Sequence, residues 1–465
     1  MLWTGIIVAV GAATFVWLFM NLAEIRDRSL TVLCFVIWLR LMASALHEIT
    51  YQSVAAGLSL NALLSIATIG FCFLFVELRL LALRVLVPVY ALIGVTIVSA
   101  LLNGEILRMI EPLSKWGYFL AIALLARTAI QRVGARDVFR LLSVAMLAPI
   151  LLQVASVGLD MPKSGATTDD FSALKAAGLN YIGGYDHESV FSGILLMFLF
   201  VTVNASTRHG RIYGFLGVLW SFAGLFFANY RTALIGMGPI AVAYFFSVVM
   251  TSTAPKARPL VLLVAAFAGF GALAFVPQDY VDRFADVAET ARGIDVIVKR
   301  PEEFTSNERE LLTGRVHIWS YYIDSWRNGG LEERLWGFGP NSWRDEFPLY
   351  AHNTFVSQLY EFGLVGLAAL VAFFSALTYS ILRTIGRTET RYLLSVWLGF
   401  ILFNLATMPL WQIEGMIFIA LIAAAAWATR PVVEIAAPRP LTLAGAPPRF
   451  ANGAAGRQTF PRPAE

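Results

Sequence analysis

Charged residues are scarce in this chain. Asp, Glu, Lys and Arg make up 14% of its 465 residues, against about 25% in soluble domains. Hydrophobic residues make up 58%, and they form many runs of about 20, the length that a helix needs to cross a bilayer. The alternating segments of roughly ten residues that build outer-membrane barrels are not evident. This composition excludes an ordinary soluble domain and predicts an all-α integral membrane protein.

Cysteine and the common catalytic motifs are also nearly absent. The two cysteines, Cys34 and Cys72, lie inside apolar runs, so we expect packing residues rather than a disulfide. The chain has no GK[ST] phosphate loop, no paired CxxC, no HExxH and no GxSxG, the usual residues of nucleotide hydrolysis, zinc sites and serine esterases. Its longest polar segment has no DxD triplet. We therefore predict neither a metal nor a cofactor.

Hydrophobic runs divide the chain into a bundle with one large loop. We expect a multi-span helical bundle of about 12–13 transmembrane helices: helices 1–10 in residues 1–276, a large outer loop at 277–351, helices 11–13 in residues 352–429, and a disordered Pro/Ala-rich tail at 430–465. The thirteen runs cover residues 2–20, 29–46, 56–77, 81–102, 115–130, 138–158, 187–205, 211–228, 231–250, 259–276, 354–382, 391–409 and 411–428.

Basic residues mark one side of this bundle. Because Lys and Arg resist translocation, the short connections that carry them are predicted to be cytoplasmic. The formal net charge of +4 then indicates membrane orientation rather than nucleic-acid binding. The loops at 159–186 and 277–351 fall on the opposite, outer side. The basic residues in question are Arg26, Arg28, Arg79, Arg84, Arg132, Arg136, Arg208, Arg211, Lys256, Arg258, Arg383, Arg387 and Arg391.

Five polar residues are predicted to converge on the outer side. His187 begins a run in GGYDHESVFSG, Arg231 in NYRTALIG, and His352 with Asn353 in AHNTFVSQLYEFGLVGL, while Arg315 lies in LTGRVHIW of the outer loop. Two guanidinium groups suit a diphosphate, because their planar fork matches phosphate oxygens in pairs. A helix beginning at Asn353 would add its N-terminal amides. Histidine adds a proton acceptor, which indicates transfer rather than binding alone.

Each of these residues, taken singly, also has a plainer interpretation. Arg231 could be an interface anchor at a helix end, and Arg315 could form a surface ion pair with the glutamates of its loop. His352 could be a helix cap and His187 a solvated loop end. Deeper in the last motif, Glu361 could pair with another span, and Gly363 could let a neighbouring helix approach.

The order of these motifs resembles the O-antigen ligase and O-antigen polymerase superfamily. HESVFSG, YRTALIG, LTGRVHIW, GFGPNSW and AHNTFVSQLYEFGLVGL follow one another over residues 187–383, and the last is the most specific. Tyr230 departs from the family, which more often has Ser before the arginine.

The resemblance implies a metal-independent, inverting glycosyltransferase of the bacterial inner membrane. It implies transfer of a glycan from undecaprenyl diphosphate to an acceptor sugar hydroxyl on the periplasmic face. By position, His352 matches the catalytic histidine, and Arg231 and Arg315 match the diphosphate-binding arginines. His187 and Asn353 are possible substrate-binding residues.

Three functions stay open at this point. We favour a polymerase for exopolysaccharide, capsule or O-antigen, whose acceptor is another lipid-linked repeat unit. A ligase would use lipid A core instead. A flippase or transporter for lipid-linked sugars would show an internal repeat and mid-membrane charges, neither of which is clear here. The implied partners are an undecaprenyl-diphosphate-linked oligosaccharide, an acceptor glycan and membrane lipids, with no nucleic acid.

Overall fold

The computed structural model describes residues 2–55, 58–163, 180–205, 210–273, 296, 299–384 and 392–428. These ranges are almost entirely helical, and the strands within them form one antiparallel pair, β1 (Ser53–Ala55) and β2 (Leu58–Ser59). The predicted tail at 430–465 and the first part of the outer loop lie outside the described residues, so the predicted domain limits stay predictions.

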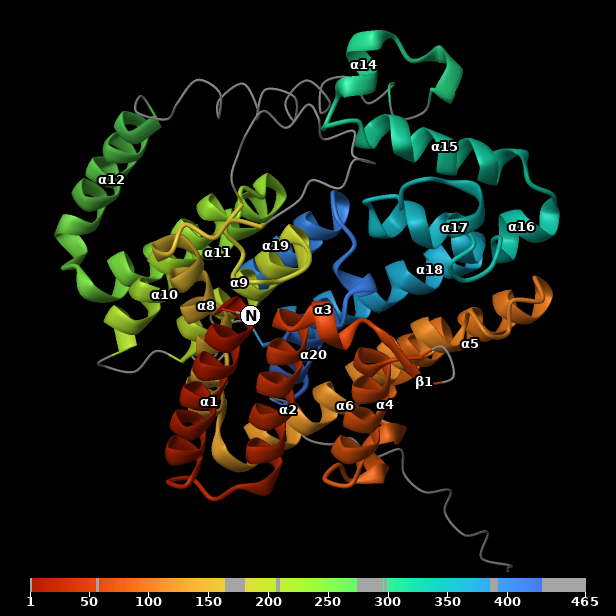
Figure 1. The fold of residues 1–465 in the computed structure, drawn as a ribbon. Coiled ribbons are helices and arrows are strands. Elements are labelled where there is room, and N and C mark those ends of the chain that lie inside the picture. The colour runs from red at the N-terminus through yellow and green to blue at the C-terminus, as the bar shows by residue number, and fades with distance from the viewer. Residues whose placement is uncertain are drawn as a thin grey trace, which may run out of the picture.

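Each of the thirteen predicted runs contains a helix (Figure 1). In the described residues, seven helical segments are long and apolar enough to cross a membrane, and five apolar helices are shorter. The prediction of an all-α multi-span membrane protein is confirmed. The first ten runs give α1 (Leu2–Leu22), α2 (Arg28–Ala45), α4 (Leu60–Phe73), α5 (Val87–Leu102), α6 (Ile110–Val133), α7 (Ala135–Ala145) with α8 (Leu147–Gly158), α9 (Glu188–Asn204), α10 (Gly210–Phe227), α11 (Arg231–Ser252) and α12 (Arg258–Leu273).

The outer loop and the last runs supply the remaining helices. The short α3 (His47–Thr50) follows α2, and the described part of the outer loop folds into small helices that gather beside the start of α18 (Figure 1). The helices of the outer loop are α14 (Ser306–Glu310), α15 (Arg315–Asn328), α16 (Leu331–Trp336) and α17 (Trp343–Glu346). The last three runs give α18 (Thr354–Leu382), α19 (Leu393–Leu405) and α20 (Ile413–Ala428). Short 3-10 helices lie elsewhere along the chain: η1 (Leu78–Ala82), η2 (Arg84–Leu86), η4 (Pro255–Ala257), η6 (Pro301–Glu303) and η8 (Pro409–Trp411).

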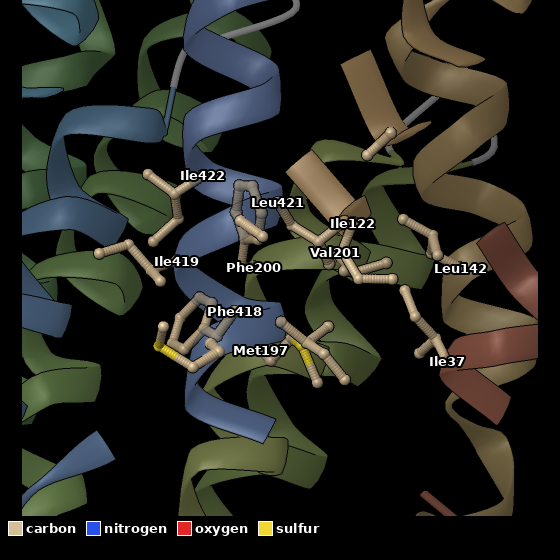
Figure 2. Close-up of a cluster of buried hydrophobic side chains, with 14 of the residues drawn as sticks. Ile37, Ile122, Leu142, Met197, Phe200, Val201, Phe418, Ile419, Leu421 and Ile422 are labelled. Carbon is tan, nitrogen blue, oxygen red and sulfur yellow. The ribbon is translucent and has the colours of Figure 1, made fainter. Parts of the chain in front are cut away.

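The bundle core lies where α9 and α20 meet α2, α6 and α7. Figure 2 shows Phe200 of α9 beside Phe418 of α20, with Ile37, Ile122 and Leu142 contributed by the three neighbouring helices. The two phenylalanine rings lie 6.1 Å apart. Cys34 and Cys72 are free and fully buried in the same cluster, so the expectation of packing cysteines is confirmed. Because lipid is as apolar as these side chains, association of the helices depends on close packing.

A buried ion pair joins the second helix to the last one. Arg40 Nε of α2 donates to Glu414 Oε1 in the first turn of α20 at 2.8 Å, and both side chains are at most 5% exposed. Ser44 also donates to Glu414, and Arg40 donates to Asn61 of α4. Removing one partner of such a pair costs about 3–5 kcal/mol. The pair therefore fixes three helices together near one end of the bundle.

The two ends of the bundle are distinguished by their contacts. At the inner end, Arg132 donates to Ser29 Oγ at 3.2 Å and lies 3.6 Å from Glu77. At the outer end, the ring Nδ1 of His47 lies 3.0 Å from Gly184 O. The arginine-bearing connections near 28, 79 and 132 thus share one end, as the charge pattern predicts. Which end faces the cytoplasm stays a prediction.

The outer loop is joined to α18 at a break in that helix. Gly363 has φ 65° and ψ −165°, and the loop backbone at 338–339 donates to Tyr360 O and Glu361 O, each at 3.0 Å. A side chain at Gly363 would meet the backbone of Leu335. Leu335 and Trp336 end the outer-loop helix α16, so glycine here lets a neighbouring helix approach, as expected from the sequence, and that helix is part of the outer loop.

Candidate functional site

Two arginines begin two helices that meet at the outer end. Arg231 is the first residue of α11 and Arg315 the first residue of α15. Arg315 Nη1 donates to Thr232 Oγ1 at 3.0 Å, which brings the two N-termini together. Neither helix has a side-chain cap hydrogen bond. The amides of both first turns, the positive ends of both macrodipoles and the guanidinium group of Arg315 therefore concentrate positive potential in one place, with Arg231 as the first residue of α11.

Left-handed backbone geometry accompanies these residues. Asn229, shortly before Arg231, has φ 51°, and Leu312, Thr313 and Gly314 have φ between 50° and 80° directly before Arg315. His352 itself has φ 50°. Such conformations cost about 1–3 kcal/mol each outside glycine, and they persist where the surroundings enforce them, commonly at functional sites. No residue pattern in the sequence indicates this strain, because only Gly314 is a glycine.

Two histidines meet on one tyrosine. The rings of Tyr350 and His352 lie 3.9 Å apart between centroids, inclined at 36°. Tyr350 Oη lies 3.4 Å from His187 Nε2. Residues 187 and 352, which are far apart in the sequence, are thus brought together as predicted, and Tyr350 is the connecting residue that sequence reasoning missed. The sequence feature that could have pointed to Tyr350 is its place two positions before His352.

The neighbours of His187 indicate which tautomer its neutral ring adopts. His187 is the N-cap of α9, where its Nδ1 accepts a hydrogen bond from the Ser189 amide at 3.0 Å. In the neutral ring the proton therefore lies on Nε2, facing Tyr350. Gln412 Nε2 donates to Ser189 Oγ at 2.9 Å, and that hydroxyl lies 2.9 Å from His187 Nδ1. His187 is thus arranged as a hydrogen-bond donor rather than as a base.

Asn353 caps α18 with its side chain. Its Oδ1 accepts from the amides of Phe355 and Val356 at 2.9 and 3.2 Å, and its Nδ2 donates to Leu405 O at 2.8 Å. Asparagine is a preferred N-cap for this reason. Two of the amides that we expected to face a phosphate are therefore occupied by Asn353 itself, whereas the N-termini of α11 and α15 lack a side-chain cap. The cap of α18 is Asn353, not His352.

The outer end of α19 lies between Arg231 and Arg315 (the arginine pair) and His352 with Asn353. Tyr230, adjacent to Arg231, has its ring 6.3 Å from that of Phe403 in an edge-on arrangement. At the next residue of α19, Asn404 Oδ1 accepts a hydrogen bond from Thr354 Oγ1 at 2.7 Å. The arginine pair and the His352–Asn353 pair therefore flank the same short segment, residues 403–405. The described residues hold no group of three or more His, Cys, Asp or Glu arranged to bind a metal.

The deeper polar residue Glu361 supports the loop rather than another span. Its carboxylate accepts from the Asn341 amide at 2.7 Å and from Ser357 Oγ. Asn341 belongs to the GFGPNSW motif and also has positive φ, 58°. This arrangement differs from the pairing with a span expected from the sequence. It holds the GFGPNSW segment of the outer loop against α18, a short distance along the chain before Tyr350 and His352.

Comparison with known families agrees with the resemblance found in the sequence. Residues 216–371 match the family model described as O-Antigen ligase. The matched segment contains Arg231, Arg315, His352 and Asn353, and His187 lies before it. No curated protein matches the chain. The match confirms the resemblance to the O-antigen ligase and polymerase superfamily over this segment.

Proposed function

We propose that this chain, whose residues 216–371 match the O-antigen ligases, is a metal-independent, inverting glycosyltransferase of the bacterial inner membrane. It transfers a glycan from undecaprenyl diphosphate to an acceptor sugar hydroxyl on the periplasmic face. The observation that carries the proposal is the meeting of Arg231 and Arg315 on two uncapped helix N-termini, joined through Thr232 and linked to His352 by the outer end of α19.

The arginine pair suits the diphosphate of the donor. Guanidinium groups stay charged and bind phosphate oxygens through two parallel hydrogen bonds. Uncapped first-turn amides bind the remaining oxygens. The polyprenyl tail holds the diphosphate at the depth of the membrane surface, where α11 and α15 begin. As charge develops on the leaving diphosphate, the same groups stabilise it without reorganisation.

His352 is placed to activate the acceptor. In the proposed step the acceptor hydroxyl gives its proton to His352, and its oxygen forms a bond to the anomeric carbon of the donor. The bond from that carbon to the diphosphate breaks, and undecaprenyl diphosphate leaves with the electron pair. Attack opposite the leaving group inverts the anomeric configuration. General-base help of this kind contributes about 10² to 10⁴ in rate.

Polymerisation and ligation differ only in the acceptor. We retain polymerisation of lipid-linked repeat units as the reaction that we favour, while the description of the matching family favours attachment to lipid A core. A flippase needs no base beside its anion site. The pairing of arginines with histidines therefore supports transfer over transport.

The proposal is tested with the full chain in lipid nanodiscs. Purified protein receives the lipid-diphosphate glycan of the native cells, with either an excess of that donor or lipid A core as acceptor, in buffer containing EDTA. We expect release of undecaprenyl diphosphate and formation of a new glycosidic bond with one of the two acceptors. Binding of the donor without turnover on either acceptor would contradict the proposal.

A further inference from the structure

Three aromatic rings extend from His352 across the outer surface. Tyr350, whose ring packs on His352, lies 6.1 Å from Trp343 between ring centroids, and Trp343 lies 5.6 Å from Trp411. We call Tyr350, Trp343 and Trp411 the aromatic shelf. They come from three separate segments, namely the end of the outer loop, α17 and η8. The shelf is continuous with the proposed base.

These rings lie at the rim of a small core rather than inside it. Tyr322 and Tyr360, each 1% exposed, fill the centre of the cluster between the outer loop and α18. The three shelf rings pack against that cluster but keep part of their surface exposed. Packing of the loop therefore accounts for the inner rings, and the three shelf residues remain partly exposed.

Charged side chains border the shelf at the end away from His352. Lys115 Nζ lies 5.1 Å above the Trp411 ring and 2.7 Å from Glu111 Oε1. Arg344 Nη2 lies 3.2 Å from Glu111 Oε2, and its guanidinium lies 5.8 Å from the Trp343 ring. Glu111 is 40% exposed and Arg344 52% exposed. Hydrogen-bonding groups of both kinds, donors and acceptors, are thus accessible beside the rings.

The shelf also contains a donor without an acceptor. Among the described residues, no hydrogen-bond acceptor lies within reach of the buried indole N–H of Trp343. A buried N–H left without a partner is destabilising. A ligand oxygen that reached this N–H would supply the missing acceptor.

We propose that the aromatic shelf binds a sugar ring of the acceptor glycan. A pyranose has a C–H face that packs on aromatic rings and a rim of hydroxyls, and the shelf offers ring faces together with Lys115, Glu111 and Arg344. The inference rests on the proposed function, because His352 takes its proton from the acceptor. The arginine pair holds the donor on one side of residues 403–405, so the shelf on the other side of His352 receives the acceptor.

The test measures glycan binding separately from donor binding. The probe is a set of short oligosaccharides released by mild acid from the polysaccharide of the native cells. Saturation-transfer NMR titrations on the full chain in nanodiscs give the Kd of the probe, and a second titration with undecaprenyl diphosphate gives the Kd of the donor anchor. Because Trp343→Leu removes both the stacking ring and the indole N–H, it should raise the Kd of the oligosaccharide about tenfold or more.

Two further variants sharpen the result. Trp343→Phe keeps a ring but removes the indole N–H, so the Kd of the oligosaccharide should rise less in this variant than in Trp343→Leu. Trp220→Leu is the matched control, because Trp220 of α10 also has an indole N–H without an acceptor in the described structure but lies away from the shelf. Trp220→Leu should leave the Kd unchanged, and all variants should keep the Kd for undecaprenyl diphosphate.

The outcomes separate this inference from the proposed function. Oligosaccharide binding at the wild-type level in Trp343→Leu overturns the shelf, even if His352→Ala remains inactive. If Trp343→Leu loses binding of both the oligosaccharide and undecaprenyl diphosphate and has a lower melting temperature, Trp343 serves packing alone. That result also overturns the proposal that the shelf binds the acceptor. If the wild-type protein binds the donor but transfers its glycan to neither acceptor, the proposed function fails whatever the shelf binds.

Discussion

Arg315 Nη1 and Thr232 Oγ1 lie 3.0 Å apart, although 83 residues separate them in the chain. This single hydrogen bond joins the first turn of a helix in the outer loop to the first turn of a membrane helix. It leaves most of the guanidinium donors of Arg315 available for an anion, since the group has five.

Replacing Arg315 by Lys should strongly reduce transfer. Lysine keeps the positive charge but loses the planar fork, and hydrogen bonds to charged groups are worth about 1.5–3 kcal/mol. We expect product formation to fall about 10- to 100-fold while the protein stays inserted and abundant. Arg334→Lys, an exposed arginine of the same loop, is the control and should be unaffected. Near-normal product from Arg315→Lys would reduce Arg315 to a surface contact.

Replacing His352 should separate its chemistry from its fold. His352→Ala is expected to lower turnover by at least about 100-fold with donor affinity retained. Because His352 has φ 50°, His352→Gly should be at least as stable as the wild type and equally inactive. Turnover and donor affinity are measured on both variants in nanodiscs. Turnover within about tenfold of the wild type in the glycine variant would exclude the role of a base.

Gly363→Ala should loosen the outer loop from α18. The added methyl group would collide with the backbone of Leu335, and Gly363 has φ 65°, so we expect a loss of about 2–4 kcal/mol. The melting temperature in detergent should fall, and the outer loop should become more sensitive to protease. Gly238→Ala in α11 has open space around it and serves as the control. Equal melting temperatures for the two variants would argue against the loop junction.

Sidedness is tested with fusions to a reporter that is active only in the periplasm. The alternation of basic connections predicts activity for a fusion after residue 300 and silence for one after residue 387. The reverse pattern would place Arg315 and His352 on the cytoplasmic side. The candidate site would then face away from the periplasm, where the proposed reaction uses the donor glycan.

Acid should weaken the described outer loop around His317. Burial between Phe304 and Tyr321, whose rings lie 5.0 and 4.9 Å away, lowers the pKa of His317 below its usual value, and nearby Arg309 lowers it further. The unfolded loop therefore takes up the proton first, and stability falls as the pH drops below about 6.5. Hydrogen exchange of residues 304–321, corrected for its intrinsic pH dependence, should rise between pH 7.5 and 5.

A variant isolates this histidine from the other acids of the loop. His317→Phe keeps an aromatic ring in the same place and cannot titrate, so its exchange should change less over the same pH interval. Identical acid responses in the variant and the wild type would show that other groups, and not His317, weaken the loop.

The gross architecture and the location of the site followed from simple patterns. Apolar runs of spanning length predict the helices, and alternating arginines predict which connections share an end. Together the two patterns placed His187, Arg231, Arg315 and His352 at one end of the bundle. The contacts of His187 with Tyr350 and of Arg315 with Thr232 agree with this prediction.

What the sequence could not predict depends on contacts between distant segments. The helix that approaches Gly363, the outer-loop helix α16, could not be identified from the sequence. The N-terminal amides of α18 were expected to face a phosphate, but the structure shows that Asn353 caps two of them. Left-handed geometry at Leu312 and Thr313 runs against residue preference and is imposed by the surrounding fold. The buried pair of Arg40 and Glu414 was likewise missed, because each residue alone is one charge near a helix end.

That pair also bears on how the protein is made. Arg40 and Glu414 are 374 residues apart, so α2 enters the membrane long before its counter-charge has been synthesised. Throughout that interval the guanidinium lacks its carboxylate, and α2 depends on Asn61 of α4 or on the membrane surface to accommodate it. A chain truncated before Glu414 would retain this unbalanced charge, and completion of the bundle therefore awaits the final helix.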